Sequence, residues 1–311
     1  MSGRLLAIAL GNSLLWSLYL LLTRHVVAGA RLDAWAYTLV QLLIGGLAML
    51  WVGRRAPGSW GDLLAPWTVG YAFLRVAING ATSAAVVWLA ITQSTLLATA
   101  SVLIGALLGW LLTKQSPQRR DWPGLAILGL GILAFAIAIA SEATWRGIAW
   151  LLLSEILAVT GSWIIAYHPR NRATDMAARC RFTGEILVAA SMALILTWSL
   201  AGLAGLIASP WAGAGDAFGR VELWLYAALA GLLFRAPGTW LGFWTINTTG
   251  VQTYLIALSA MPFFAIALEA AAAQMGWVNP PRLAAAEWIA AAIILGASTW
   301  LISIRLRAAA P

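Results

Sequence analysis

Charged residues are scarce in this chain. Of its 311 residues only 10% are charged, with Lys+Arg at 19 and Asp+Glu at 11, whereas 62% are hydrophobic. A water-soluble domain carries a charged fraction of about 25%, because its surface must be polar. The shortage of charge excludes a soluble globular protein and predicts that much of the surface faces a lipid bilayer.

Cysteine, lysine and histidine are also nearly absent. The single cysteine, Cys180, excludes an intrachain disulfide and a thiolate metal site. The sequence has no Ser–His or Ser–Lys pair at depth, no aspartate-rich motif and no phosphate-binding loop of the Gly-x-x-x-x-Gly-Lys type. An intramembrane enzyme is therefore the least favoured class, ATP-driven transport is not expected, and no cofactor is predicted. The net charge of +8 comes from scattered arginines, so nucleic acid is not an expected partner.

Long hydrophobic runs are what the chain does contain. A transmembrane helix needs about 20 mostly apolar residues to cross the hydrocarbon core. The sequence predicts an all-α membrane protein with ten transmembrane helices, at residues 5–22, 34–52, 67–90, 95–112, 123–140, 147–166, 182–203, 223–243, 248–270 and 286–303.

The basic residues are divided unevenly between the two sides of these helices. With a cytoplasmic N-terminus, 12 lie in inner segments, 5 in outer segments and 2 within runs. This bias predicts a multi-pass protein with both termini in the cytoplasm. Arginine in place of lysine, together with abundant alanine, indicates a GC-rich bacterial genome and hence the bacterial cytoplasmic (inner) membrane. The sequence leaves open whether the protein is a monomer or a homodimer in the bilayer.

The chain also contains an internal repeat. Residues 90–103 align with residues 245–258 at an offset of 155. The alignment predicts a first five-helix repeat at 1–142 and a second at 143–311. Because five is odd, the second copy enters the membrane from the opposite side, and two inverted five-helix repeats are typical of secondary transporters.

Short motifs within the repeat resemble a known family. The segment Ala90 to Leu112, followed by Trp122-Pro123-Gly124-Leu125, resembles the repeat unit of EamA-like transporters in the drug/metabolite transporter superfamily. Leu258-Ser259-Ala260-Met261-Pro262 is similar to the proline motif of that unit's fourth helix. One departure is Leu107, which stands where the first copy would have this proline. The resemblance implies a carrier of small molecules.

A carboxylate at depth suggests proton coupling. Leu153-Ser154-Glu155-Ile156-Leu157 resembles the first helix of the small multidrug resistance proteins, where a membrane glutamate exchanges protons for organic cations. A carboxylate in such a position binds either a proton or a cation, so the two compete. Two other acidic residues are predicted to be structural: Glu269 at the outer end of its run, reaching the interface, and Glu185 in an i,i+4 ion pair with Arg181.

Two arginines lie inside predicted spans, where an unpaired charge is costly. Arg75 shares a helix face with Asn79 and Thr82 and so forms a polar stripe. Arg235 precedes Ala236-Pro237-Gly238, which should interrupt the helix, and the 155 offset places it opposite Gly80. Arg235 either forms an ion pair with Glu155 that locks two helices, or both residues bind substrate; the sequence leaves both open.

Aromatic and amide side chains complete the predicted site. Asn12, Trp16 and Tyr19 lie on one face of the first run, and Trp163 lies two turns from Glu155. Aromatic faces beside a carboxylate suit an ammonium group, whereas the arginines suit a carboxylate. The predicted substrate-binding residues are Glu155, Arg235, Arg75, Asn79, Asn12, Trp16, Tyr19 and Trp163.

Together these features predict a secondary active transporter that works by alternating access at a midplane cavity. The predicted activity is export of a small amphiphilic metabolite, such as an aromatic amino acid or an organic cation. A passive channel or a non-transporting membrane protein is the alternative.

Overall fold

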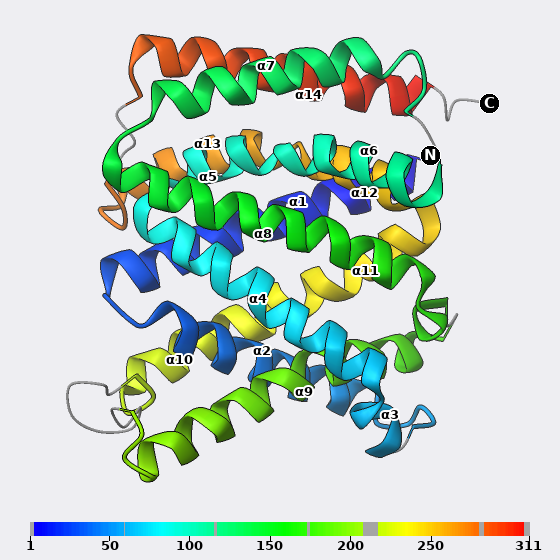
Figure 1. The fold of residues 1–311 in the computed structure, drawn as a ribbon, viewed down its shortest axis with the longest axis vertical. Coiled ribbons are helices and arrows are strands. Elements are labelled where there is room, and N and C mark those ends of the chain that lie inside the picture. Colours follow the sequence, from blue (N-terminus) through cyan, green and yellow to red (C-terminus); the bar gives the residue numbers. More distant parts are fainter. Residues whose placement is uncertain are drawn as a thin grey trace.

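The computed structural model describes residues 3–58, 60–114, 117–172, 175–207, 217–279 and 283–307. All regular secondary structure in these ranges is helical. Most of the longer helices run across the view of Figure 1, and α14 ends at the side where α1 begins.

The first part of the chain, up to residue 138, contains α1 (Gly3–Arg24), the π-helical η1 (His25–Gly29), α2 (Ala34–Val52), α3 (Trp60–Leu64), α4 (Pro66–Trp88), α5 (Ile91–Ala98), α6 (Ala100–Thr113) and α7 (Trp122–Ala138). The second part contains α8 (Glu142–Tyr167), η2 (Pro169–Arg172), α9 (Met176–Leu203), α10 (Val221–Ala230), the π-helical η4 (Gly231–Arg235), α11 (Ala236–Thr249), α12 (Val251–Leu258), α13 (Met261–Gln274) and α14 (Ala285–Arg307).

Each of the ten predicted runs coincides largely with helix. Among the described residues, six helical segments are long and apolar enough to cross a membrane: Ala34–Val52, Ile91–Leu112, Glu142–Tyr167, Met176–Leu203, Val251–Gln274 and Ala285–Arg305. The other four runs fall on α1, α4, α7 and α10 to α11, which are shorter or interrupted by polar residues. The described part of the chain is all-helical and has the apolar helices of a multi-pass membrane protein.

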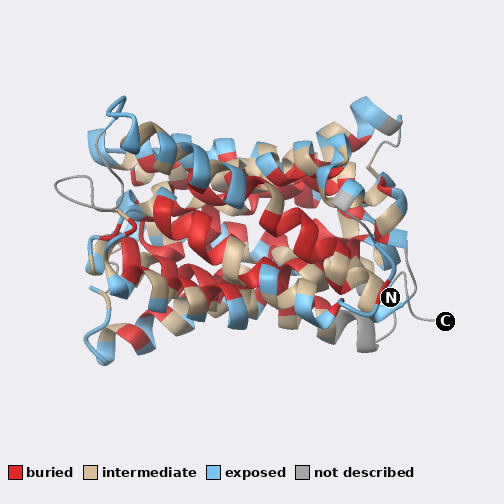
Figure 2. Cartoon of the chain, turned by 90° about the horizontal axis from the view of Figure 1, so that it is seen from below, coloured by how far each residue is buried: buried red, intermediate tan, exposed pale blue. Residues whose placement is uncertain are grey.

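The outer surface of the helices is apolar. Figure 2 shows buried residues gathered at the centre and exposed ones at the periphery. Large hydrophobic side chains are exposed there, for example Leu130 and Ile137 on α7, Leu200 on α9 and Ile289 on α14. Such an outer surface is unfavourable in water, and it is the surface that lipid tails accept.

The helices of the two parts pack on one another in corresponding pairs. Helix α2 packs on α9, and α7 on α14, while the contact of α4 with α8 has its counterpart in that of α11 with α1. The α7–α14 pair lies along one edge of the molecule (Figure 1), where Arg305 donates to Asp121 at 2.6 Å. The core is therefore built between the two parts rather than inside each.

The structure corrects the predicted register of the repeat. Helix α5 begins at Ile91 and α12 at Val251, which are 160 residues apart rather than 155. The predicted offset matched the α4–α5 turn with the last turns of α11, because apolar helical sequences remain similar when shifted. With an offset of 160 residues between the two copies, Arg235 corresponds to Arg75 instead of Gly80, and Thr239 corresponds to Asn79.

In each part, the fourth hydrophobic run forms two helices instead of one, and the first of the two is eight residues long. Helix α5 ends at Ala98 before Thr99, and α12 ends at Leu258 before Ser259 and Ala260. The Thr99 hydroxyl donates to the Leu96 carbonyl at 2.6 Å, so hydroxyl groups satisfy backbone carbonyls at the break. Pro262, the proline of the family motif, lies in the first turn of α13, directly after this break.

Glu269 is fully buried, so the prediction that it reaches the interface is wrong. Its carboxylate oxygens accept hydrogen bonds from the backbone N–H groups of Ile91 at 3.0 Å and Thr92 at 2.8 Å. Arg24 donates to the carbonyls of Val86 and Leu89 at the end of α4. Two charged side chains thus cap the helix ends on either side of the α4–α5 turn, where free backbone groups would be costly.

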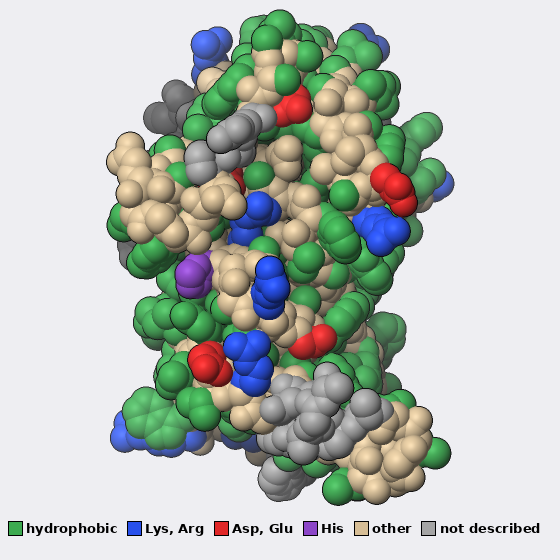
Figure 3. Space-filling model, turned by 90° about the vertical axis from the view of Figure 1, so that its left-hand side faces the viewer, with side chains coloured by type: hydrophobic (Ala, Val, Ile, Leu, Met, Phe, Trp, Pro, Cys, Tyr) green, Lys and Arg blue, Asp and Glu red, His purple; other side chains and the backbone are tan. Residues whose placement is uncertain are grey.

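This turn lies near the end of the molecule opposite the N-terminus. Figure 3 looks onto that end, where charged side chains of both signs lie on the face and hydrophobic side chains form the edges. The exposed ion pairs Arg146–Glu142 and Arg220–Glu222, both at 3.8 Å, belong to helix starts on this side. They contribute little stability because water screens them.

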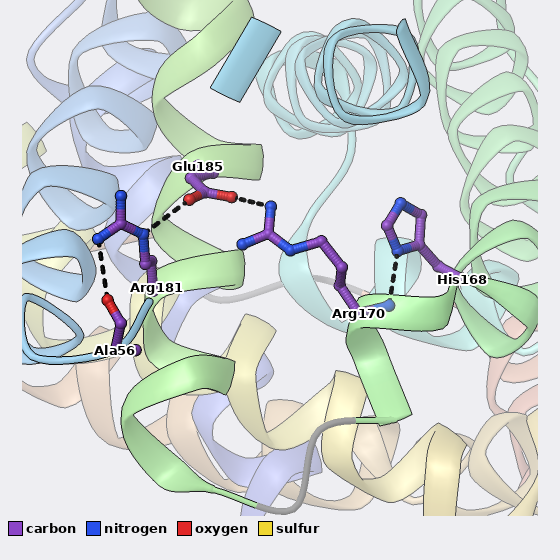
Figure 4. A network of polar contacts seen from close by, with 5 residues as sticks. All are labelled: Ala56, His168, Arg170, Arg181 and Glu185. Carbon is purple, nitrogen blue, oxygen red and sulfur yellow. Dashed lines mark hydrogen bonds and ion pairs between the residues drawn. The ribbon is translucent and has the colours of Figure 1, made fainter. Parts of the chain in front are cut away.

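At the opposite end, Glu185 joins three segments of the chain (Figure 4). The predicted pair with Arg181 is confirmed at 3.1 Å, and Arg170 of η2 is a second partner. Arg181 also donates to the carbonyl of Ala56 at 3.2 Å. Glu185 therefore fixes both η2 and the segment after α2 against α9.

His168, beside this network, predicts a pH dependence of stability. Burial lowers the pKa of His168, and the neighbouring Arg170 lowers it further. The unfolded chain takes up this proton at a higher pH than the folded protein, so stability decreases as the pH falls below about 6.5. We expect the melting temperature in detergent to fall less between pH 7 and pH 5 in His168→Gln than in the wild type; equal decreases would contradict this.

Candidate functional site

A cavity of about 130 Å³ lies at the centre of the molecule. Helices α1, α4, α5, α6, α8, α12 and α13 and the π-helical turn η4 all contribute to its wall. Six of the eight predicted site residues line it: Trp16, Tyr19, Arg75, Asn79, Glu155 and Arg235.

Two predicted residues, Asn12 and Trp163, do not line this cavity. Asn12 is fully buried against the α11 face that carries Gly238 and Gly242. Trp163 packs against Gly109 of α6 and stacks on Tyr167 with ring centres 6.4 Å apart. Helical spacing placed both near the correct face, but a small rotation of each helix determines which side chains reach the cavity.

Arg235 is only 1% exposed and lies between two aromatic rings. Its guanidinium carbon is 4.6 Å from the Trp16 ring centre and 4.7 Å from that of Tyr19. The Tyr19 hydroxyl accepts a hydrogen bond from Gln41 at 2.9 Å, which fixes the ring. Each such contact stabilises a desolvated cation by up to about 2 kcal/mol, so the rings hold this charge in place.

The guanidinium of Arg235 is incompletely hydrogen-bonded. Its Nε and Nη2 atoms are buried and have no hydrogen-bond partner among the described residues. The ion pair with Glu155, one of the two roles considered from the sequence, is not formed within the described part of the chain. The aromatic pair on α1 holds Arg235 instead, and this leaves donors available to an anion.

The helix around Arg235 bends without breaking. Sequence predicted an interruption at Pro237; the structure has the π-helical turn η4 immediately before it, and α11 continues from Ala236. Proline lacks a backbone donor, and a π-type turn accommodates this loss within a continuous helix. The wider turn positions Arg235 at the cavity.

Arg75 lies on the polar stripe of α4. Its Nη2 donates to the Thr239 hydroxyl at 3.2 Å, whereas its Nε is buried without a partner. Its backbone carbonyl accepts from Asn79 at 2.6 Å. Because Thr239 belongs to α11, this contact crosses between the two parts of the chain, and Arg75 keeps a free donor as Arg235 does.

Glu155 is half-buried on the cavity wall of α8. The neighbouring Ser154 hydroxyl bonds to Thr82 at 2.6 Å and to the Ile78 carbonyl at 3.1 Å, which fixes this turn of α8 against α4. Glu155 itself has no ion-pair partner in the described ranges. Two guanidinium groups and one carboxylate thus border the same space.

Sequence reasoning missed several cavity residues, among them Ser94, Thr95, Ser101 and Tyr254. All four lie on the helices beside the two breaks: α5, α6 and α12. Hydroxyl residues are tolerated in transmembrane helices because they bond to their own backbone, so they give a weak signal alone. The clustering of three hydroxyls around the Thr99 break was the available indication.

The fold is that of a multi-pass helical membrane protein, with an internal cavity bordered by charged side chains. Residues 3–137 match the family model described as "EamA-like transporter family". This match confirms the predicted resemblance over these residues.

A solved structure titled "Crystal structure of protein" has a similar fold. It is 16% identical, with a TM-score of 0.61, and the alignment covers 100% of each chain. No curated protein matches the sequence.

Proposed function

We propose that this protein is a secondary active transporter of small zwitterionic metabolites, with aromatic amino acids as the leading candidates. The observation that carries the proposal is the cavity itself, bordered by two guanidinium groups with unpaired donors and by one carboxylate. The arginines suit a substrate carboxylate and Glu155 suits an ammonium group. A substrate with both charges leaves none of these groups unpaired.

An organic cation is the less favoured substrate. Trp16 and Tyr19 would have supplied the aromatic faces for it, but Arg235 already occupies both. A cation would also have to enter a space with two positive groups and one negative group. Electrostatic repulsion therefore opposes its binding.

The proposed mechanism is alternating access between two inverted five-helix repeats, residues 1–142 and 143–311. The corresponding helix pairs, the repeat spacing of 160 and the equivalence of Arg75 and Arg235 support this arrangement. The repeats would tilt around the cavity and open it to either side in turn.

Glu155 is the proposed site of proton coupling in the bacterial inner membrane, with export as the direction of transport. Its carboxylate would bind a proton when the substrate has left and the substrate ammonium when it is present, so the two cannot occupy it together. The lipid bilayer and the small-molecule substrate are the only partners that the proposal requires.

Counterflow in proteoliposomes tests this function. The panel contains L-phenylalanine, L-tryptophan, benzoate and tetraphenylphosphonium, at pH 6 and pH 8. We expect saturable exchange of the amino acids, at least a tenfold loss in Arg75→Gln, and loss of the pH dependence in Glu155→Gln. Arg220→Gln, at an exposed ion pair, is the control.

Exchange of tetraphenylphosphonium but not of the amino acids would contradict a zwitterionic substrate and favour a carrier of organic cations. Flux that does not saturate would contradict a carrier and favour a channel.

A further inference from the structure

Serine and threonine side chains form much of the polar wall of the central cavity. Of the six among the described residues, five donate their hydroxyl group to a backbone carbonyl of their own or an adjacent helix: Thr82, Thr95, Ser101, Ser154 and Ser162. Such a bond makes a hydroxyl group tolerable inside a membrane helix, and it occupies the only proton of that group. These five side chains are therefore satisfied by the protein itself.

Ser94 of α5 is the sixth, and its hydroxyl group is not used in this way. The side chain is fully buried, and its Oγ atom has no hydrogen-bond partner among the described residues. The Ala90 carbonyl, one turn earlier, accepts the backbone N–H of Ser94 at 2.8 Å but not the hydroxyl. Because a buried polar group without a partner is unfavourable, this hydroxyl on the cavity wall is available to a ligand.

Ser94 lies away from the carboxylate of the cavity. Glu155 lies beside Ser101 at the start of α6, which is seven residues after Ser94. At a rise of about 1.5 Å per residue, this spacing amounts to about 10 Å along the two helices. Ser94 belongs to the first turn of α5, so it borders the end of the cavity nearest the α4–α5 turn.

The wall between these two positions is apolar. Ala98 lies about one turn from both Ser94 and Ser101, and Leu151 lies one turn before Glu155 on α8. Ala98 and Leu151 both line the cavity. A molecule held at Glu155 that extends toward the α4–α5 turn therefore passes an apolar surface before it reaches the Ser94 hydroxyl.

We infer that Ser94 is a specificity-determining residue, whose hydroxyl group binds a hydrogen-bonding group at the far end of the substrate's side chain. The inference rests on the proposed function and makes it narrower. Arg75 and Glu155 hold the carboxylate and ammonium groups, which all amino acids share, so they cannot distinguish one side chain from another. Tyrosine carries a hydroxyl group at the tip of its ring and can pair with Ser94. Phenylalanine would displace water from Ser94 without replacing the hydrogen bond.

Counterflow with L-tyrosine and L-phenylalanine tests the inference, because the two differ by one hydroxyl group. We expect wild type to exchange tyrosine about tenfold better than phenylalanine at limiting concentration, and Ser94→Ala to reduce this ratio to about one. The loss should fall on tyrosine. Ser94→Ala removes no hydrogen bond that the described residues make, so its melting temperature in detergent should not lie below that of the wild type.

Ser298→Ala is the matched control. Ser298 of α14 is also fully buried, and its hydroxyl group also lacks a partner in the described ranges, but it does not line the cavity. Its tyrosine-to-phenylalanine ratio should equal that of the wild type.

Two results would overturn the role of Ser94 while the transporter stands. One is equal exchange of the two amino acids by the wild type, and the other is a loss in Ser94→Ala that affects both by the same factor. A melting temperature of Ser94→Ala well below that of Ser298→Ala would also overturn it, because the hydroxyl group would then have a structural role. If the wild type exchanges neither amino acid, the proposed function fails and the role of Ser94 fails with it.

Discussion

Replacing Glu269 with alanine is expected to lower the free energy of unfolding by about 3 kcal/mol. The carboxylate is fully buried and accepts two backbone hydrogen bonds at the start of α5. Its removal leaves the N–H groups of Ile91 and Thr92 without their acceptors, and it leaves Arg24 without the nearby negative charge. Each loss is costly because water has no access to this position.

Thermal unfolding in detergent measures this loss. We expect the melting temperature of Glu269→Ala to lie at least about 5 °C below that of the wild type. Glu222→Ala is the control, because Glu222 is exposed and its ion pair with Arg220 is long at 3.8 Å; we expect no measurable change. Glu269→Gln retains one acceptor, so its melting temperature should lie between those of Glu269→Ala and Glu222→Ala. A melting temperature unchanged in Glu269→Ala would show that the cap does not contribute to stability.

Replacing Arg235 with methionine is expected to reverse the charge preference of the cavity. The variant removes a buried positive charge and frees the Trp16 and Tyr19 faces that it covers. Glu155 would then border the same space with one arginine instead of two. We expect phenylalanine to bind at least about tenfold more weakly, and tetraphenylphosphonium about tenfold more tightly.

Binding of each ligand by titration calorimetry in detergent measures both changes. Arg146→Met is a matched control, because Arg146 also lies over a tryptophan ring, Trp88 at 5.7 Å, but is exposed near the start of α8. A variant that loses phenylalanine without gaining the cation would show that the aromatic faces are not accessible to ligands. Unchanged binding of both would remove Arg235 from the site.

Local patterns predicted the helices and the charged residues that line the cavity. Hydrophobic runs gave the helical segments because crossing a bilayer leaves the backbone few alternatives to a helix. The stripe of Arg75, Asn79 and Thr82 predicted a polar face on α4, and all three residues line the cavity. Arg75, Glu155 and Arg235, the charged residues well inside the predicted spans, indicated the cavity. A charge inside a membrane is costly and is tolerated only where another group or a polar cavity compensates for it.

Relations between distant segments were not predictable in the same way. The repeat register was wrong by five residues, because apolar helical sequences align nearly as well after a shift, whereas the helix starts at Ile91 and Val251 fix it. The surroundings of Arg235 depend on α1, more than 200 residues earlier in the chain. Glu269 was assigned to the interface because nothing in its own helix indicates that its partner is the start of α5.

The cap formed by Glu269 is not repeated in the other half of the chain. At the spacing of 160, its counterpart is Gly109, which has no carboxylate to offer the start of α12. Two exactly symmetrical halves would give inward- and outward-open forms of equal free energy. A hydrogen-bonded cap that only one of these two equivalent positions carries makes the forms unequal, so under alternating access the empty carrier rests in one of them. Its apparent affinity for substrate would then differ between the two faces of the membrane.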